Sequence, residues 1–139
     1  MQKIFLFLLL IICFNANSQT NKYRAISGGF SVLEEGYYPN FMGDNSIIVL
    51  SVENKKMTIY HNDETESNYH FLKVLSNEMD EDKNTWGKIL SVDDEGEKCE
   101  IILIELAKAQ YEKTQKEYYK FQLIIKYTNT YMMINMNSL

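Results

Sequence analysis

Hydrophobic and polar residues alternate along much of the chain, and the clearest example is residues 85–106. An acidic turn that ends in Gly96 divides this stretch into two runs of strand-forming residues. Because glycine adopts the left-handed backbone conformation that a short hairpin loop requires, the pattern predicts a β-hairpin. In its second strand, one face carries Cys99, Ile101 and Leu103. The other face carries Ile102, Ile104 and Leu106. Both faces are apolar, which predicts a strand that is central in its sheet or covered on both sides.

The same alternation predicts further strands on both sides of this hairpin. They are expected at residues 27–33, 46–52, 57–61, 69–75, 118–127 and 131–136. Residues 19–25 are polar and are expected to form a loose lead-in. Residues 107–117 are rich in helix formers but lack a clean apolar stripe. This favours a short helix or an irregular crossover, with a long strand end and a polar loop as the alternative.

Eight strands with short connections and a single Pro predict an all-β domain with room for one short helix. Successive hairpins favour an antiparallel meander, which can form a small barrel or a two-layer sandwich. A barrel has the advantage that it leaves no open sheet edge. In size and strand count such a barrel resembles the lipocalins, at the level of architecture alone.

The first eighteen residues differ from the rest of the chain. A basic start at Lys3 is followed by a short apolar run and by small residues at Ala16 and Ser18, which is the pattern of a secretory signal peptide. We therefore expect cleavage after Ser18, and one β-rich domain at residues 19–139 that is exported to the periplasm or the extracellular space. The apolar run is too short to span a bilayer, so no membrane span is expected after processing.

The two cysteines have different expected fates. Lipid attachment at Cys13 is disfavoured, because Ile12 occupies the position that a small residue normally takes before a lipidated cysteine. Without the leader, Cys99 is the only thiol left, so no internal disulfide can form. Its place among isoleucines predicts a small buried hydrophobe rather than a reactive group.

The formal net charge is −5 and becomes −6 when Lys3 is removed with the leader. An acidic surface repels phosphate backbones, and no basic stripe with interleaved aromatic residues is present in the sequence. Nucleic acid is therefore not expected as a partner.

Residues 34–45 have the Gly, Pro, Asn and Asp content of a loop. This loop nevertheless carries four large side chains, Tyr37, Tyr38, Phe41 and Met42. They either fold inward as a plug over the end of the sheet or stand ready to contact another protein, because such residues are favoured anchors in interfaces. These four are the candidate binding residues.

No catalytic or metal-binding motif is recognisable, so we expect no enzymatic activity, no metal and no cofactor. His61 and His70 flank an acidic loop, but their spacing matches no zinc signature. Asp80, Asp82 and Asn84 begin like a calcium loop, but the sharp-turn Gly and the bidentate Glu of that loop are missing further on.

Two non-catalytic functions are expected from these features. The first is an exported interaction module, such as an inhibitor or accessory subunit, which presents the 34–45 loop to another protein. The alternative is a carrier that holds a small apolar ligand in a lipocalin-like barrel. The expected lining residues are then Trp86, Phe121, Leu123 and Ile125. Since a barrel of eight strands is commonly filled by its own side chains, the interaction module ranks first.

Overall fold

The computed structural model describes residues 20–32, 36–39 and 45–139, except residue 114. Within these residues all regular structure is β-strand, and no helix is present that could cross a membrane. The strands are β1 (Thr20–Val32), β2 (Gly36–Pro39), β3 (Ile47–Ser51), β4 (Lys56–Tyr60), β5 (Glu66–Met79), β6 (Thr85–Asp93), β7 (Lys98–Glu112), β8 (Glu117–Lys126) and β9 (Thr130–Ser138).

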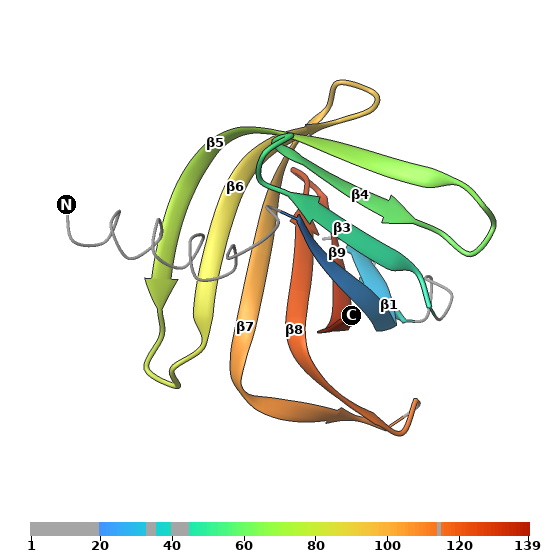
Figure 1. The fold of residues 1–139 in the computed structure, drawn as a ribbon, viewed down its shortest axis with the longest axis vertical. Coiled ribbons are helices and arrows are strands. Elements are labelled where there is room, and N and C mark those ends of the chain that lie inside the picture. Colours follow the sequence, from blue (N-terminus) through green and yellow to red (C-terminus); the bar gives the residue numbers. More distant parts are fainter. Residues whose placement is uncertain (1–19, 33–35, 40–44, 114) are drawn as a thin grey trace.

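Neighbouring strands pair antiparallel in the order β2-β1-β3-β4-β5-β6-β7-β8-β9, and β1 also pairs with β9. The eight described strands other than β2 thus close into a barrel, and β2 adds beside β1 (Figure 1). The expected all-β antiparallel meander is confirmed, and of its two expected forms the barrel is the one observed. Closure satisfies the backbone hydrogen bonds that the edges of an open sheet would leave unpaired.

Strand β1 joins the two ends of the meander. Its residues 20–24 pair with β3 on one edge, and Tyr23 lies opposite Ile48. Most of its length pairs with β9 on the other edge, with a register shift between Ala25 and Ser27. Such a bulge bends a strand and increases its twist, which suits a strand that closes a barrel.

Two segments that were expected to lack strands are paired. Residues 20–25 belong to β1, and Tyr23 and Ala25 lie buried in the barrel core. The expected lead-in is therefore wrong over these residues, because pairing with β3 and burial of alternate side chains outweigh a polar composition. Residues 36–39 were expected within a loop, but they form β2 and pair with β1.

Strands β7 and β8 continue past the barrel as an arm, formed by residues 107–112 of β7 and residues 117–120 of β8. In this arm Tyr111 lies opposite Tyr118, and their ring centroids are 5.1 Å apart. The arm bends across the lower end of the barrel in Figure 1, and Glu117 forms an ion pair with Arg24 of β1. The favoured helix or irregular crossover is wrong here, and residues 107–112 instead form the long strand end that was the alternative. Cross-strand pairing overrides the helix propensity of the sequence.

Alternate side chains of the barrel strands point inward and form one apolar core. Its buried members are Tyr23, Ala25, Ile48, Leu50, Met57, Ile59, Tyr69, Cys99, Ile101, Phe121, Leu123, Ile125, Ile134 and Met136. Within this core Ile101 lies between Ile89 of β6 and Ile125 of β8 in the strand register.

A second, smaller apolar cluster lies on the outer face of β7. Its buried residues are Ile102, Ile104 and Leu106, packed against Trp86, Tyr119 and Ile124. Strand β7 is thus central and covered on both faces, as its sequence predicts.

Candidate functional site

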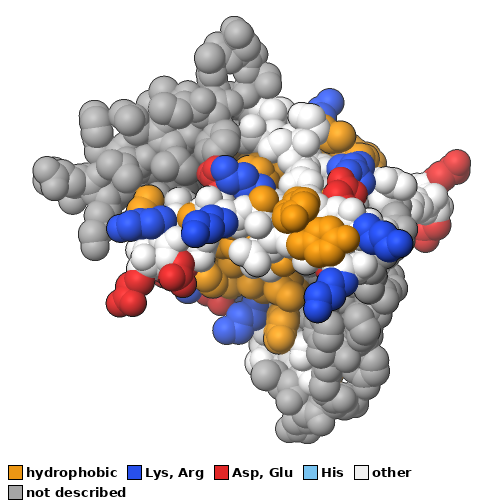
Figure 2. All heavy atoms as spheres, turned by 90° about the horizontal axis from the view of Figure 1, so that it is seen from below, with side chains coloured by type: hydrophobic (Ala, Val, Ile, Leu, Met, Phe, Trp, Pro, Cys, Tyr) orange, Lys and Arg blue, Asp and Glu red, His pale blue; other side chains and the backbone are white. Residues whose placement is uncertain are grey.

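One end of the barrel interior is not filled by side chains. Strands β3 and β4 have 5 residues each, whereas β5 has 14, β6 has 9 and β7 has 15. The long strands extend beyond the β3–β4 hairpin, as Figure 1 shows. Figure 2 views the molecule from below and shows hydrophobic side chains gathered on this face, with charged side chains around them. A cavity of about 390 Å³ lies at this end, between β1, the β3–β4 hairpin and the inner faces of β5 to β8.

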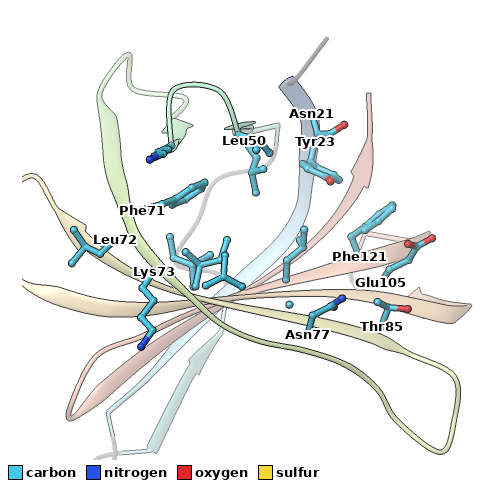
Figure 3. Close-up of a pocket in the computed structure, with 17 residues that line it drawn as sticks. Asn21, Tyr23, Leu50, Phe71, Leu72, Lys73, Asn77, Thr85, Glu105 and Phe121 are labelled. Atoms are coloured by element: carbon cyan, nitrogen blue, oxygen red, sulfur yellow. The ribbon is translucent and has the colours of Figure 1, made fainter. Parts of the chain in front are cut away.

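Most of the cavity wall is hydrocarbon. The apolar lining includes Tyr23, Leu50, Phe71, Ile89, Leu103 and Phe121. Figure 3 shows that Phe71, Leu50, Tyr23 and Phe121 are arranged around a central space. Tyr23 and Phe121 pack edge to face, with ring centroids 5.2 Å apart, a geometry that aromatic pairs favour. The cavity is thus an apolar chamber with aromatic side chains on its walls.

Polar side chains border the cavity at few points. Asn21, Asn77 and Thr85 contribute amide and hydroxyl groups. Lys55 and Lys73 also border it, but Figure 3 shows the side chain of Lys73 directed away from the central space. The neutral and basic polar groups that face the cavity are therefore these amide and hydroxyl groups and the ammonium group of Lys55.

Glu105 is the one carboxylate among the described lining residues. It follows Ile101 and Leu103 on the inward face of β7, where alternation would place another apolar side chain. In the register it lies between Thr85 of β6 and Phe121 of β8, which both line the cavity. The strand pairing therefore sets one negative charge at the edge of an apolar wall.

The electrostatic partners of Glu105 are few. Its nearest described cation is the Lys120 ammonium group, with 3.9 Å between nitrogen and oxygen, and the two side chains are 36% and 50% exposed. A pair that is this long and this exposed is weak. Burial raises the pKa of Tyr23 to about 12 and the charge of Glu105 adds to this, so the phenol stays protonated near neutral pH.

The opposite end of the barrel is filled and carries a hydrogen-bonded group. The Tyr127 hydroxyl donates to Asp93 Oδ2 at 2.8 Å. Burial raises the pKa of Tyr69 to about 12, and it also raises the pKa of Tyr127. Cys99 is buried at this end, and burial raises the pKa of its thiol to about 11. These phenols and the thiol are therefore protonated near neutral pH. They pack this end of the barrel, and the protonated thiol is a poor nucleophile.

The four residues expected to line a cavity are placed differently from one another. Phe121 lines it. Leu123 and Ile125 point into the barrel on the same strand face but are fully buried in the filled part. Trp86 lies on the outer face of the barrel against Ile104, and its indole N–H donates to Asp80 at 2.9 Å. The structure thus removes Trp86 from the lining.

Alternation alone does not single out Tyr23, Leu50, Phe71 and Leu103, which also line the cavity. It identifies inward-facing positions but not the end at which the barrel is hollow. The signal that carries this information is the unequal length of the strands, which is hidden in the sequence because polar residues occupy the ends of β5 and β7.

The candidate interaction residues are only partly placed. The backbone of Tyr37 and Tyr38 belongs to β2 and pairs with Ser31 and Phe30 of β1. The side chains of these tyrosines, and all of Phe41 and Met42, lie outside the part of the chain that the structure describes. Their role stays a prediction.

The polar features that resemble metal motifs have other structural uses. His61 contacts Ser67, with 2.9 Å between Nε2 and Oγ, and the β4–β5 register places His70 opposite Lys56 at the other end of that hairpin. The hydrogen bond from Trp86, together with bonds from Asn84, lowers the pKa of Asp80. Among the described residues no cluster of His, Cys, Asp or Glu is arranged to hold a metal ion.

Comparison of the chain with protein-family models, with curated proteins and with solved structures gave no significant match. The cavity and its lining are therefore the features from which a function can be argued.

Proposed function

We propose that this protein binds a small, largely apolar molecule inside its barrel. The observation that carries the proposal is the cavity of about 390 Å³ with its apolar wall. Ligand sites in proteins are typically concave and mostly apolar, with a few polar groups and a volume of roughly 300–1,000 Å³. An apolar ligand that enters such a cavity removes hydrocarbon surface from water, which favours binding.

This proposal reverses the ranking of the two functions expected from the sequence. The interaction module ranked first because small barrels are commonly filled by their own side chains. Here the end near Tyr127 is packed with buried core side chains, whereas the end near Glu105 holds the cavity. A carrier or sensor of a small molecule is therefore the first candidate, and the secretory signal expected from the sequence of residues 1–18 would place it outside the cytoplasm.

A neutral fluorescent probe tests this function. We expect N-phenyl-1-naphthylamine to bind the protein saturably, with one site per chain and enhanced fluorescence, because it is apolar and uncharged. Absence of saturable binding by this probe and by linear alcohols would refute the proposal. Emission from Trp86 is a poor reporter of binding, since this residue lies outside the barrel.

Two neighbouring residues of β5 provide a matched pair of variants. Val74 lines the cavity and is 47% exposed, whereas Leu75 is 42% exposed and is not part of the lining. Val74→Trp should weaken probe binding at least several-fold, because the larger indole would occupy space at the solvent-exposed edge of the cavity. Leu75→Trp should leave the affinity unchanged. Equal effects of both changes would contradict this location for the site.

A second candidate function is contact with another protein through Tyr37, Tyr38, Phe41 and Met42. It is supported by the position of β2, which pairs only with β1 among the described strands and so has one unpaired edge. Exposed strand edges are sites at which another chain can add. Replacement of the four residues by Ser should abolish capture of such a partner and leave a cooperative melt. Loss of folding instead would indicate that they belong to the core.

A further inference from the structure

We propose that the cavity takes a cationic amphiphile, a molecule with an apolar chain and an ammonium head, and that this head lies against Glu105. The inference rests on the ligand-binding function proposed above and adds the charge of the ligand. It starts from one juxtaposition, a carboxylate on the inner face of β7 at the edge of an apolar cavity.

The position of Glu105 favours a bound cation. Part of its side chain is shielded from water, with 36% exposed, and it shares the inner face of β7 with Leu103. A carboxylate beside hydrocarbon loses hydration and gains from a nearby positive charge. Lys120 at 3.9 Å is the only described cation within ion-pair distance, and its side chain is half exposed. The Glu105 carboxylate can therefore accept further hydrogen bonds from an ammonium head.

The neighbours of Glu105 suit an ammonium head as well. Phe121 lies directly opposite Glu105 in the strand register and packs edge to face with Tyr23. The faces of aromatic rings attract cations. Thr85, opposite Glu105 on the other side, offers a hydroxyl oxygen as a further acceptor for the three N–H donors of an ammonium group.

The positive charges at the cavity do not cancel this preference. The side chain of Lys73 is directed away from the central space in Figure 3. Lys55 lies in the turn between β3 and β4, where it is exposed to water. The net charge of the chain is −5, which favours the approach of cations over anions. A carboxylate head group, in contrast, would face repulsion from Glu105.

Three probes with the same tail and different heads test the inference. Decylamine, decan-1-ol and decanoate are each used to displace N-phenyl-1-naphthylamine at pH 7, below their micelle concentrations. We expect the protein to bind decylammonium about tenfold more tightly than decanoate, as a charge-assisted hydrogen bond would give. Glu105→Gln should remove this preference and leave decan-1-ol unaffected. Glu100→Gln, on the outer face of the same strand, should retain it.

The outcomes separate the two proposals. Failure of decan-1-ol and the fluorescent probe to bind refutes the ligand-binding function itself. Binding of decan-1-ol without a preference for the amine, or tighter binding of decanoate, refutes the role of Glu105 alone. Retention of the preference in Glu105→Gln also refutes it. Urea unfolding of both variants checks that they are folded, so that a loss of affinity reports on the site.

Discussion

The Tyr127 hydroxyl donates a 2.8 Å hydrogen bond to Asp93, although the two residues are 34 positions apart. The same Asp93 carboxylate accepts hydrogen bonds from the backbone N–H groups of Glu95 and Glu97 in the β6–β7 turn, at 3.0 and 2.9 Å. One side chain thus closes the turn of the central hairpin and ties it to the end of β8. This link lies at the end of the barrel that is opposite to the cavity.

Replacement of Tyr127 tests this link through its pH dependence. Burial alone would raise the pKa of Asp93, but the hydrogen bonds from Tyr127 and the turn outweigh it and lower the pKa. Asp93 therefore stabilises the fold above its unfolded pKa of about 3.9, and this contribution is lost as the pH falls through the lower folded pKa. Tyr127→Phe should cost about 1 kcal/mol at pH 7 and less below about pH 4. Urea unfolding at both pH values measures this, and an equal loss at both would contradict it.

Substitution of two leucines tests the difference between the filled interior and the surface. Leu123→Ala should lower the free energy of unfolding by about 2–5 kcal/mol, because Leu123 is 0% exposed and its removal leaves a cavity in a packed core. Leu75→Ala should change it by less than about 0.5 kcal/mol, since this side chain is exposed. Denaturant unfolding followed by circular dichroism gives both values. A similar loss of unfolding free energy in the two variants would contradict the burial of Leu123 in the core.

Gly96 provides a test of the central turn. Its φ is +83°, and a Cβ added there would meet nothing within 4 Å. Gly96→Ala should therefore cost about 1 kcal/mol through backbone strain alone. Gly96→Asn should cost less, because asparagine tolerates the left-handed region better than alanine. Thermal or urea unfolding ranks the variants, and the opposite order would argue against this turn geometry.

Because the thiol of Cys99 is buried, we expect the folded protein to lose stability at alkaline pH. Burial raises the pKa of Cys99 to about 11, so the folded protein keeps this thiol protonated at pH values where the unfolded chain loses its proton. Its contribution to stability is therefore complete below the unfolded pKa of about 8.5 and declines as the pH rises from there towards 11. We expect a disulfide reagent to label Cys99 at pH 8 only after unfolding in urea. Rapid labelling of the native protein would contradict its burial.

The parts of the fold that the sequence predicts correctly depend on local signals. The hairpin around Gly96 is marked by its turn and by alternation on both sides, and the β3–β4 hairpin is marked in the same way. At residues 107–112 the favoured helix or crossover is wrong and the alternative strand end is right, because the helix propensity of the segment is local, whereas the pairing of Tyr111 with Tyr118 is formed only in the arm. Local composition therefore misleads where cross-strand contacts decide the structure.

The candidate site depends on information that alternation does not carry. Period two divides β6 into two faces, and the face with Trp86, Leu90 and Val92 is more apolar in pattern than the face with Ile89. Which face is internal follows from closure of the whole barrel, which places Ile89 in the lining and Trp86 outside. The same closure leaves Glu105 on the inner face, a position that no local pattern identifies.

The seam between β1 and β9 has a consequence for how the chain folds. It pairs Arg24 with Asn137, two residues that lie far apart in the sequence. The barrel therefore closes only when segments separated by most of the domain come together. Such long-range closure is characteristic of slow β-protein folding, on the order of milliseconds to seconds.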